Sequence, residues 1–401
     1  MSHAAKIIAN EITKDGAIPF ARFMQLALYC PVCGYYEKEE DTIGRVGDYY
    51  TSVSVGPLFG DLLAFQFAEW LEEERWPMGG NQQPEVKQEV AALQILEAGA
   101  HNAQLARDIL AWLGERRPGL FQRLQYWIVE PSPRRQQWQK RTLGELADKV
   151  RWVRTLADLR ASPPGHASSA TPHTGGIRQI IFANELLDAM PVHRLGWDAN
   201  SRVWFEWGVA LQEDRFVWTR LPNHPSTGLP DALLPTLDPQ LSAVLPDGFV
   251  VELCPAAAAW WRSAASVMRC GKLLTFDYGQ TADQFLTPER KAGTLRSYRC
   301  HRPSHDVLAQ PSEQDITADV DFTAIQAAGE AGGLETEDFL TQSQFLTRIA
   351  AQTWKSEGSF GEWTAERARQ FQTLTHPELM GRSFRVPVTG RNLVFGTPAC
   401  T

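Results

Sequence analysis

The spacing of hydrophobic residues changes near residue 90 of the chain. Before this point the pattern is mostly helical: within Gly60–Glu74, the apolar residues at 63, 67, 70 and 71 fall on one helix face. After the polar linker Asn81–Glu89, short apolar runs of strand length alternate with segments of helical spacing. The predicted strands are Ala92–Ala98, Gln125–Pro131, Val150–Val153, Ile177–Asn184, Phe249–Leu253 and Lys272–Asp277. This alternation predicts an α/β fold with βαβ units and a parallel sheet buried on both faces.

A second pattern interrupts the predicted sheet. Between Val192 and Arg220, aromatic residues alternate with others, as in the VWFEW segment Val203–Trp207. A period of two is typical of a strand with one buried face. We therefore expect an antiparallel meander, inserted in the sheet domain at about residues 192–248.

Two further elements are predicted near the C-terminus. Thr341–Trp354 has the pattern of a helix, and Thr341 with Gln344 forms a capping box at its start. The apolar runs Phe384–Val388 and Asn392–Phe395 are separated by a Thr-Gly-Arg sequence. This arrangement predicts a C-terminal β-hairpin.

Composition and charge indicate which classes of partner and location to expect for this protein. The 401 residues carry a net charge of -8, and 43% of them are hydrophobic, as in an ordinary globular protein. Proteins that grip nucleic acid usually have a basic face, so we expect no nucleic-acid partner. No apolar run approaches the ~18 residues of a membrane span, and the N-terminus lacks the apolar core of a secretory signal. We expect a cytoplasmic protein of bacterial type without membrane insertion.

The six cysteines are too sparse for a disulfide framework. Cys30 and Cys33 form a CxxC pair, a spacing found in zinc sites and redox motifs. Zinc would need two more ligands, for which Cys300, His301 and His305 are the only other cluster. A redox pair should open a helix after a strand, whereas this pair precedes a Gly-Tyr-Tyr sequence. We interpret it as a turn and expect no metal site.

The residues that end the predicted strands are the candidates for ligand binding, because ligands of open parallel sheets bind beyond the carboxyl ends of the strands. The first strand ends in Glu97 and continues into Gly99–His101. The second ends in Glu130, and the fourth ends in Asn184 and Glu185. A carboxylate after the second strand can accept hydrogen bonds from both hydroxyls of a ribose. NAD and S-adenosylmethionine both contain this ribose.

The loop after the first strand distinguishes the two cofactors. An NAD site uses GxGxxG with an acid about 20 residues on, and its helix N-terminus holds a pyrophosphate. Here only Gly99 matches, and Glu130 lies 31 residues later. S-adenosylmethionine has no phosphate and needs mainly close approach of the backbone, which small residues allow. The loop favours S-adenosylmethionine, with NAD and a turn without ligand as the alternatives.

Eight segments of the chain recur in the same order in one protein family. They are Gly47–Gly60, Leu96–Leu110, Tyr126–Gln139, Ala183–Leu195, Val250–Trp261, Leu273–Gly279, Gly293–His301 and Gln314–Phe322. Together they resemble the MidA-type class I S-adenosylmethionine-dependent methyltransferases over nearly the whole chain. That family includes a mitochondrial complex I assembly-factor enzyme that methylates an arginine of a complex I subunit.

The resemblance implies a Rossmann-like sheet of seven strands, mostly parallel with a last antiparallel strand, and an inserted β/helical subdomain. It implies a helical N-terminal segment at 1–90, with a loop at the substrate mouth, and a methyltransferase domain at 91–401. It assigns S-adenosylmethionine as the cofactor. The residues it places at the cofactor are Gly47, Glu97, Gly99, Ala100, His101, Glu130, Asn184 and Glu185.

The chain departs from the family in its cofactor loop. The family loop reads ExGxGxG, whereas His101 and Ala103 replace two of the glycines, and Ser54 replaces an acid of the TSPEIS segment. A histidine side chain at a close approach clashes with the cofactor unless it turns to solvent. An alanine at positive φ costs about 1 kcal/mol. We interpret the loop as a modified methyl-donor loop with weakened affinity.

An arginine acceptor requires acidic residues beside the cofactor. Its guanidinium is protonated at neutral pH, so carboxylates must hold it and a proton must be removed. Glu185 and Asp188, just beyond the fourth strand, are the best catalytic candidates, followed by Asp277 and Glu252. Each has a structural alternative: Asn184-Glu185 caps a following helix, Asp277 lies in a turn, and Glu252 pairs with a core arginine.

The sequence therefore predicts an S-adenosylmethionine-dependent methyltransferase that acts on a protein. Arginine is the leading acceptor, and a respiratory-complex subunit is one partner that the resemblance suggests. One rival is a methyltransferase fold that no longer turns over and serves as an assembly or binding factor, as His101, Ala103 and Ser54 would favour. The other is an NAD-dependent oxidoreductase, which the missing GxGxxG disfavours.

Overall fold

The structure is a computed structural model, and it divides into two compact units, each assembled from segments that are distant in the sequence. Unit 1 comprises Met1–Thr51, Leu186–Trp260 and Tyr278–Ile325, and unit 2 comprises Ser52–Glu185, Trp261–Asp277 and Gln326–Thr401. The residues that the structure describes are 2–38, 51–73, 92–161, 177–222, 234–235, 237, 239–287, 290–299, 302–304 and 306–391. The division into a helical N-terminal segment at 1–90 and a methyltransferase domain at 91–401 stays a prediction.

Unit 2 is built on a path of seven strands in the order β15-β16-β10-β5-β2-β3-β4. The strands from β10 to β4 are parallel, whereas β15 and β16 are antiparallel to each other. Their bounds are β2 Ala92–Ala98, β3 Leu124–Val129, β4 Val150–Val153, β5 Ile177–Asn184, β10 Gly271–Gln280, β15 Glu335–Thr341 and β16 Phe384–Arg391. In β2 the successive residues Ile95–Ala98 are all buried, so both faces of the strand are covered. The predicted α/β fold is confirmed.

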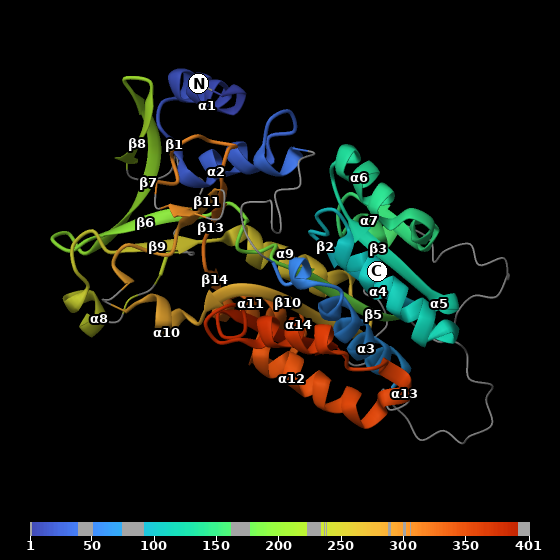
Figure 1. The fold of residues 1–401 in the computed structure, drawn as a ribbon. Coiled ribbons are helices and arrows are strands. Elements are labelled where there is room, and N and C mark those ends of the chain that lie inside the picture. Colours follow the sequence, from blue (N-terminus) through green and yellow to red (C-terminus); the bar gives the residue numbers. More distant parts are fainter. Residues whose placement is uncertain are drawn as a thin grey trace, which may run out of the picture. The chain divides into compact units, whose positions relative to one another are not determined.

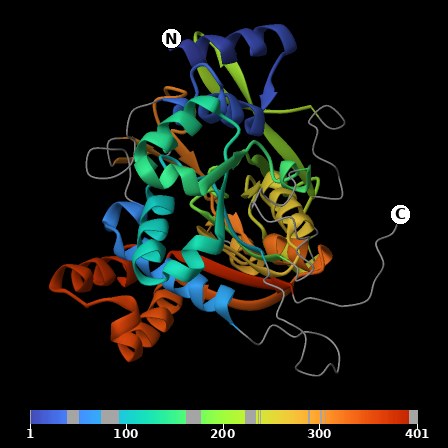
Figure 2. The same ribbon diagram turned by 90° about the vertical axis from the view of Figure 1, so that its right-hand side faces the viewer.

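Helix α3 (Leu58–Glu72) packs against α4, α12, α14 and β5 (Figures 1 and 2). Every residue from Leu58 to Ala68 is buried, so the prediction of one apolar face was too narrow. Its buried Asp61 is paired with Arg367 of α14 at 2.6 Å. The helices of unit 2 are α4 Gln104–Arg116, α5 Pro118–Arg123, α6 Pro133–Leu143, α7 Asp158–Ala161, α12 Gln342–Thr353, α13 Glu357–Phe360 and α14 Ala365–Thr375, and α9 Pro255–Val267 and α11 Phe322–Ala331 continue from unit 1.

The predicted C-terminal hairpin is wrong. Residues 389–391, which the sequence suggested as its turn, lie inside β16, where Thr389 pairs with Thr336 and Gly390 with Glu335 of β15. The supposed second strand, Asn392–Phe395, lies outside the described residues. A glycine inside a strand resembles a turn in the sequence, and the pairing partner β15 is about fifty residues away in the chain.

Unit 1 contains an antiparallel sheet with the order β1-β7-β6-β9, in which β8 also pairs with β7. The meander predicted from alternating aromatic residues is therefore confirmed. The strands and helices of unit 1 are α1 His3–Asp15, β1 Ile18–Pro19, α2 Phe20–Tyr29, β6 His193–Asp198, β7 Val203–Gln212, β8 Arg215–Arg220, α8 Pro239–Val244, β9 Val250–Leu253, α10 Ala282–Phe285, β11 Arg296–Arg299, β12 Arg302–Ser304, β13 Asp315–Thr317 and β14 Val320–Asp321.

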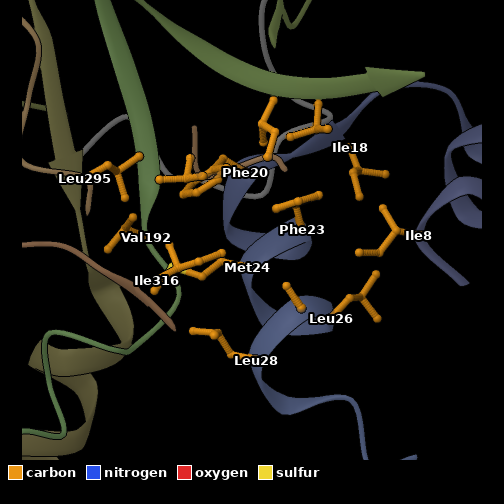
Figure 3. Packing of buried hydrophobic residues seen from close by; sticks show 14 of the residues in the cluster. Ile8, Ile18, Phe20, Phe23, Met24, Leu26, Leu28, Val192, Leu295 and Ile316 are labelled. Carbon is orange, nitrogen blue, oxygen red and sulfur yellow. The ribbon is translucent and has the colours of Figure 1, made fainter. Parts of the chain in front are cut away.

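Apolar side chains of α1, α2 and β1 form the core of unit 1 together with residues far along the chain. Phe20, Phe23 and Met24 of α2 are fully buried in the same cluster as Val192 and Ile316 (Figure 3). This packing joins the N-terminal helices to the inserted segment within one hydrophobic core. The helical pattern of the N-terminus was readable from the sequence, but its packing partner was not.

Candidate functional site

The order of the strands in unit 2 reverses between β2 and β5. The chain runs outward from β2 to β3 and β4, and then returns to β5 on the other side of β2. Ala98 of β2 lies level with Val129 of β3 and with Ala183 of β5. The residues after these three strands therefore emerge at the same edge of the sheet, which is where open α/β sheets bind their ligands.

The loop between β2 and α4 has a left-handed backbone at three positions. The φ angles are 74° at Gly99, 44° at His101 and 66° at Ala103. The Ala103 amide donates to the Ala100 carbonyl at 2.6 Å, and the Asn102 side chain accepts from the first amide of α4 at 3.0 Å. The expected positive φ at Ala103 is confirmed. The loop thus keeps a conformation that glycine adopts more readily than histidine or alanine.

The His101 side chain is held against helix α6. Its ring packs edge-on to Trp138 of α6, with 4.9 Å between the ring centres. Burial lowers the pKa of His101 to about 3, and the charge of Arg135 contributes in the same direction. The imidazole is therefore neutral at physiological pH and does not add a positive charge to the site. It does not take the solvent-facing position that the sequence analysis considered.

Glu130 follows β3 and is held by several residues of α6 and its N-terminus. One carboxylate oxygen accepts from the Ser132 amide at 3.0 Å. The other accepts from the Gln139 side chain at 3.0 Å and lies 3.2 Å from Nε of Arg135. These contacts fix the orientation of the acid that was predicted to bind a ribose.

Glu97 lies one residue before the end of β2, and only 2% of its surface is exposed. The phenol of Tyr126, in the neighbouring strand β3, donates to its carboxylate at 2.7 Å. Burial raises the pKa of Glu97 to about 7, although the Tyr126 hydrogen bond opposes this shift. The site therefore contains a carboxyl group whose charge changes near neutral pH.

Glu185 follows β5 in a strained conformation, with φ of 50°. Its amide donates to the Phe276 carbonyl at 2.8 Å, and its carboxylate accepts from the Asn184 side chain at 3.0 Å and from the Ser52 amide at 3.3 Å. The chain then continues through a turn to β6, and no helix follows. The alternative that Asn184-Glu185 caps a helix is therefore wrong. Positive φ at a glutamate is uncommon and is often kept for function.

The other predicted catalytic acids lie in different surroundings. Asp277 is fully buried within β10, which continues to Gln280, so it neither ends the strand nor lies in a turn as the sequence suggested. Asp188 is 6% exposed and belongs to unit 1, whereas Glu185 and Asp277 belong to unit 2. The grouping of these three acids stays a prediction. Gly47, predicted to contact the cofactor, lies outside the described residues.

Glu252 pairs with an arginine, as the structural alternative to catalysis predicted. Its carboxylate lies 3.3 Å from the Arg194 guanidinium and accepts from the amide and hydroxyl of Thr294 at 2.7 and 3.0 Å. Burial raises its pKa, and Arg194 opposes the shift. It belongs to unit 1 and is engaged by its own neighbours.

The CxxC pair forms the predicted turn. The amides of Cys33 and Gly34 both donate to the Cys30 carbonyl, at 3.1 and 2.7 Å. The two sulfurs lie 3.2 Å apart as free thiols. Within the described ranges, no group of three or more His, Cys, Asp or Glu residues is arranged to hold a metal ion. Cys300, His301 and His305 lie outside those ranges.

Two residues that shape the site were not predicted from the sequence. Tyr126 holds Glu97, and Gln139 holds Glu130. Gln139 and Leu143 are the buried residues of α6 and lie one turn apart on the same face. A polar residue on the apolar face of a helix was the signal that could have identified Gln139.

The polar groups at this edge of unit 2 fit S-adenosylmethionine. The Oδ1 atom of Asn184 is buried and has no hydrogen-bond partner among the residues that the structure describes. Such an acceptor requires a donor, and the methionine ammonium of the cofactor is one. Glu185 contributes a carboxylate at this edge, which suits a ligand that carries a sulfonium and an ammonium.

Comparison with known proteins gives a consistent result. Residues 63–340 match the model of a family described as "Putative S-adenosyl-L-methionine-dependent methyltransferase". The chain is 28% identical to the mitochondrial protein arginine methyltransferase NDUFAF7 of Danio rerio over 95% of its length and 85% of the relative's. It is 26% identical to the Drosophila melanogaster homologue, over 95% and 83% of the two chains.

A solved structure is similar over almost the entire chain. It is a COG1565 superfamily member from Burkholderia thailandensis, crystallised with S-adenosylhomocysteine. Its TM-score is 0.75 and its identity is 27%, and the match covers 98% of this chain and 92% of that one. These findings favour S-adenosylmethionine over NAD as the cofactor. Separately, no helix in the described part of the chain has both the length and the apolar character of a membrane span.

Proposed function

Because the chain belongs to this family, it is an S-adenosylmethionine-dependent methyltransferase, and we propose that it methylates an arginine side chain of a protein substrate. The observation that carries the proposal is Glu185, a carboxylate held at positive φ at the edge of the sheet where the residues after β2, β3 and β5 emerge. The relatives named as protein arginine methyltransferases support the same acceptor. When bound, S-adenosylmethionine supplies a methyl group on a positively charged sulfur.

Each residue of the edge has a distinct part in this proposal. Glu130 would hold the ribose through its fixed carboxylate, and Asn184 would accept from the methionine ammonium through its buried oxygen. Backbone groups of the Gly99–Ala103 loop would lie against the methionyl part. Because positioning supplies most of the catalysis in a displacement at a methyl group, these residues would act by fixing geometry rather than by chemistry of their own.

Glu185 would act on the acceptor. A guanidinium is protonated at neutral pH and must lose a proton during or after methylation. The Glu185 carboxylate would pair with it and orient one nitrogen, and would take up or pass on the released proton. The contacts of Glu185 with Asn184 and Ser52 hold this carboxylate in place before the substrate binds. Asp277 and Asp188 remain further candidates for the same function.

The proposal also includes three more specific expectations from the sequence. They are a class I arrangement in which the last strand is antiparallel to the others, a protein partner that could be a respiratory-complex subunit, and a cytoplasmic location. The antiparallel pair β15 and β16 supports the first of these. A chain that keeps the fold but transfers methyl groups poorly is the second candidate, because His101 and Ala103 strain the cofactor loop.

The test is methylation of arginine-containing protein fractions, read by mass spectrometry. Glu185→Gln keeps the hydrogen-bond acceptor for Asn184 and Ser52 but removes the charge, so we expect kcat to fall on the order of 100-fold while the affinity for S-adenosylhomocysteine changes little. Glu145→Gln makes the same change at an exposed position and should have no effect. Methyl groups found on lysine or on chain termini, or full activity of Glu185→Gln, would refute the proposal.

A further inference from the structure

Gln139 lies at the centre of a hydrogen-bonded network that includes the loop after β2 and Glu130, two parts of the proposed cofactor site. Its side chain is fully buried, and its oxygen accepts from the indole N–H of Trp152 at 2.8 Å. An indole N–H can only donate, so this contact fixes which way the amide faces. The NH₂ group of Gln139 is therefore directed away from Trp152, toward His101 and Glu130.

That NH₂ group connects two parts of the site. It donates to the backbone carbonyl of His101 at 3.0 Å and to the Glu130 carboxylate at 3.0 Å. This side chain therefore binds both the loop after β2 and the acid after β3.

The loop needs such a contact more than a glycine-rich loop would. His101 has φ of 44° and Ala103 has φ of 66°, and a left-handed backbone is less favourable for histidine and alanine than for glycine. A conformation of this kind persists only where its surroundings hold it. Glu130 is different, because Ser132 and Arg135 also hold it. The contribution specific to Gln139 is the hydrogen bond to the strained residue.

We propose that Gln139 is a positioning residue that keeps the substituted loop in its cofactor-binding conformation and in register with Glu130. It touches neither the acceptor nor the reacting atoms. The proposal depends on the cofactor and not on the identity of the methyl acceptor. A failure of arginine methylation therefore leaves it unaffected.

The test measures binding of S-adenosylhomocysteine by calorimetry, so no turnover is needed. Gln139→Leu leaves the Glu130 and His101 oxygens without this donor, and we expect the affinity to fall about tenfold or more. In a background of His101→Gly with Ala103→Gly, the loop adopts its conformation without help. In that background, the factor by which Gln139→Leu lowers the affinity should be several-fold smaller.

A second buried glutamine provides the control. Gln179 in β5 also has both ends of its amide engaged, by the Gln94 side chain and the Arg269 amide. It lies near the start of the strand, at the end opposite Asn184. Gln179→Leu should lower the melting temperature to a similar degree but leave the affinity unchanged.

Three results would overturn the proposal: an unchanged affinity in Gln139→Leu, an equal loss with and without the two glycines, or no binding by the unmodified chain. If Gln139→Leu does not fold, Gln139→Glu replaces it. This variant keeps the shape and the acceptor for Trp152 but brings a second carboxylate to Glu130. It should bind less tightly than the unmodified chain at neutral pH and recover part of the affinity as the pH falls. Affinity equal to that of the unmodified chain would again refute the positioning role.

Discussion

At the scale of single residues, the site contains a carboxyl group that titrates in the pH range of the cell. Glu97 has a pKa of about 7 in the folded protein, compared with an ordinary value of 4.5. Between about pH 4.5 and about pH 7, Glu97 keeps a proton in the folded chain that it has lost in the unfolded chain. The stability contribution of Glu97 therefore falls as the pH rises through this window and is level above it.

Glu97→Gln removes this titration while keeping an acceptor for Tyr126. Its free energy of unfolding, relative to the unmodified chain, should increase by roughly 3 kcal/mol between about pH 4 and about pH 8. Denaturant unfolding at both pH values measures the difference. Glu145→Gln at an exposed position controls for the loss of a charge. A difference that does not depend on pH would mean that the pKa of Glu97 is the same in the folded and the unfolded chain.

At the scale of elements, helix α12 shows how local sequence fixes a boundary. Its capping box is present as predicted: the Thr341 hydroxyl accepts from the Gln344 amide, and the Gln344 side chain accepts from the Thr341 amide. Thr341→Ala should cost about 1 kcal/mol of stability. Thr347→Ala, the same change at an exposed position inside the helix, should cost almost nothing. Equal effects of the two changes on the melting temperature would contradict a capping role.

The turn between β7 and β8 shows where local sequence is a poor guide. Gln212 pairs with Arg215, so the connection consists of Glu213 and Asp214. Both have positive φ, at 45° and 60°, as in the tight hairpin turns that usually contain Asn-Gly. The alternation of the strands predicted the meander, but these two residues do not identify the turn. Pairing between the strands fixes it instead.

At the scale of the whole molecule, ligand binding distinguishes an active methyltransferase from a fold that has lost its cofactor. A ligand present at 100 times its dissociation constant adds about 2.7 kcal/mol to the stability of the form that binds it. S-adenosylmethionine and S-adenosylhomocysteine should therefore raise the melting temperature by a few degrees, and NAD should not. Differential scanning fluorimetry of the purified chain measures this.

If none of the three ligands raises the melting temperature, the chain is better explained as an assembly or binding factor. His101→Gly with Ala103→Gly then separates two causes. If the two glycines restore the ligand-induced rise in melting temperature, the strained loop caused the loss of binding. If the melting temperature still does not rise, the cause lies elsewhere in the site.

The sequence by itself determined the elements of the sheet and the acids at its edge. Apolar runs of strand length are periodic signals that neighbouring residues carry, and β2, β4 and β5 have the predicted bounds. Acids at the carboxyl ends of parallel strands are brought to one edge by topology alone, so the sequence could place Glu97, Glu130 and Glu185 there. Their part in binding the cofactor stays a prediction.

Only the tertiary structure decided what holds those acids. The role of Gln139 depends on Trp152, His101 and Glu130, which come from three other elements, and the placement of residues 389–391 in a strand depends on pairing with β15. In the same way, the N-terminal helices share one core with residues beyond 190. Contacts between distant segments leave no periodic pattern in the sequence, because the neighbours of a residue in the chain do not specify which distant residue it contacts.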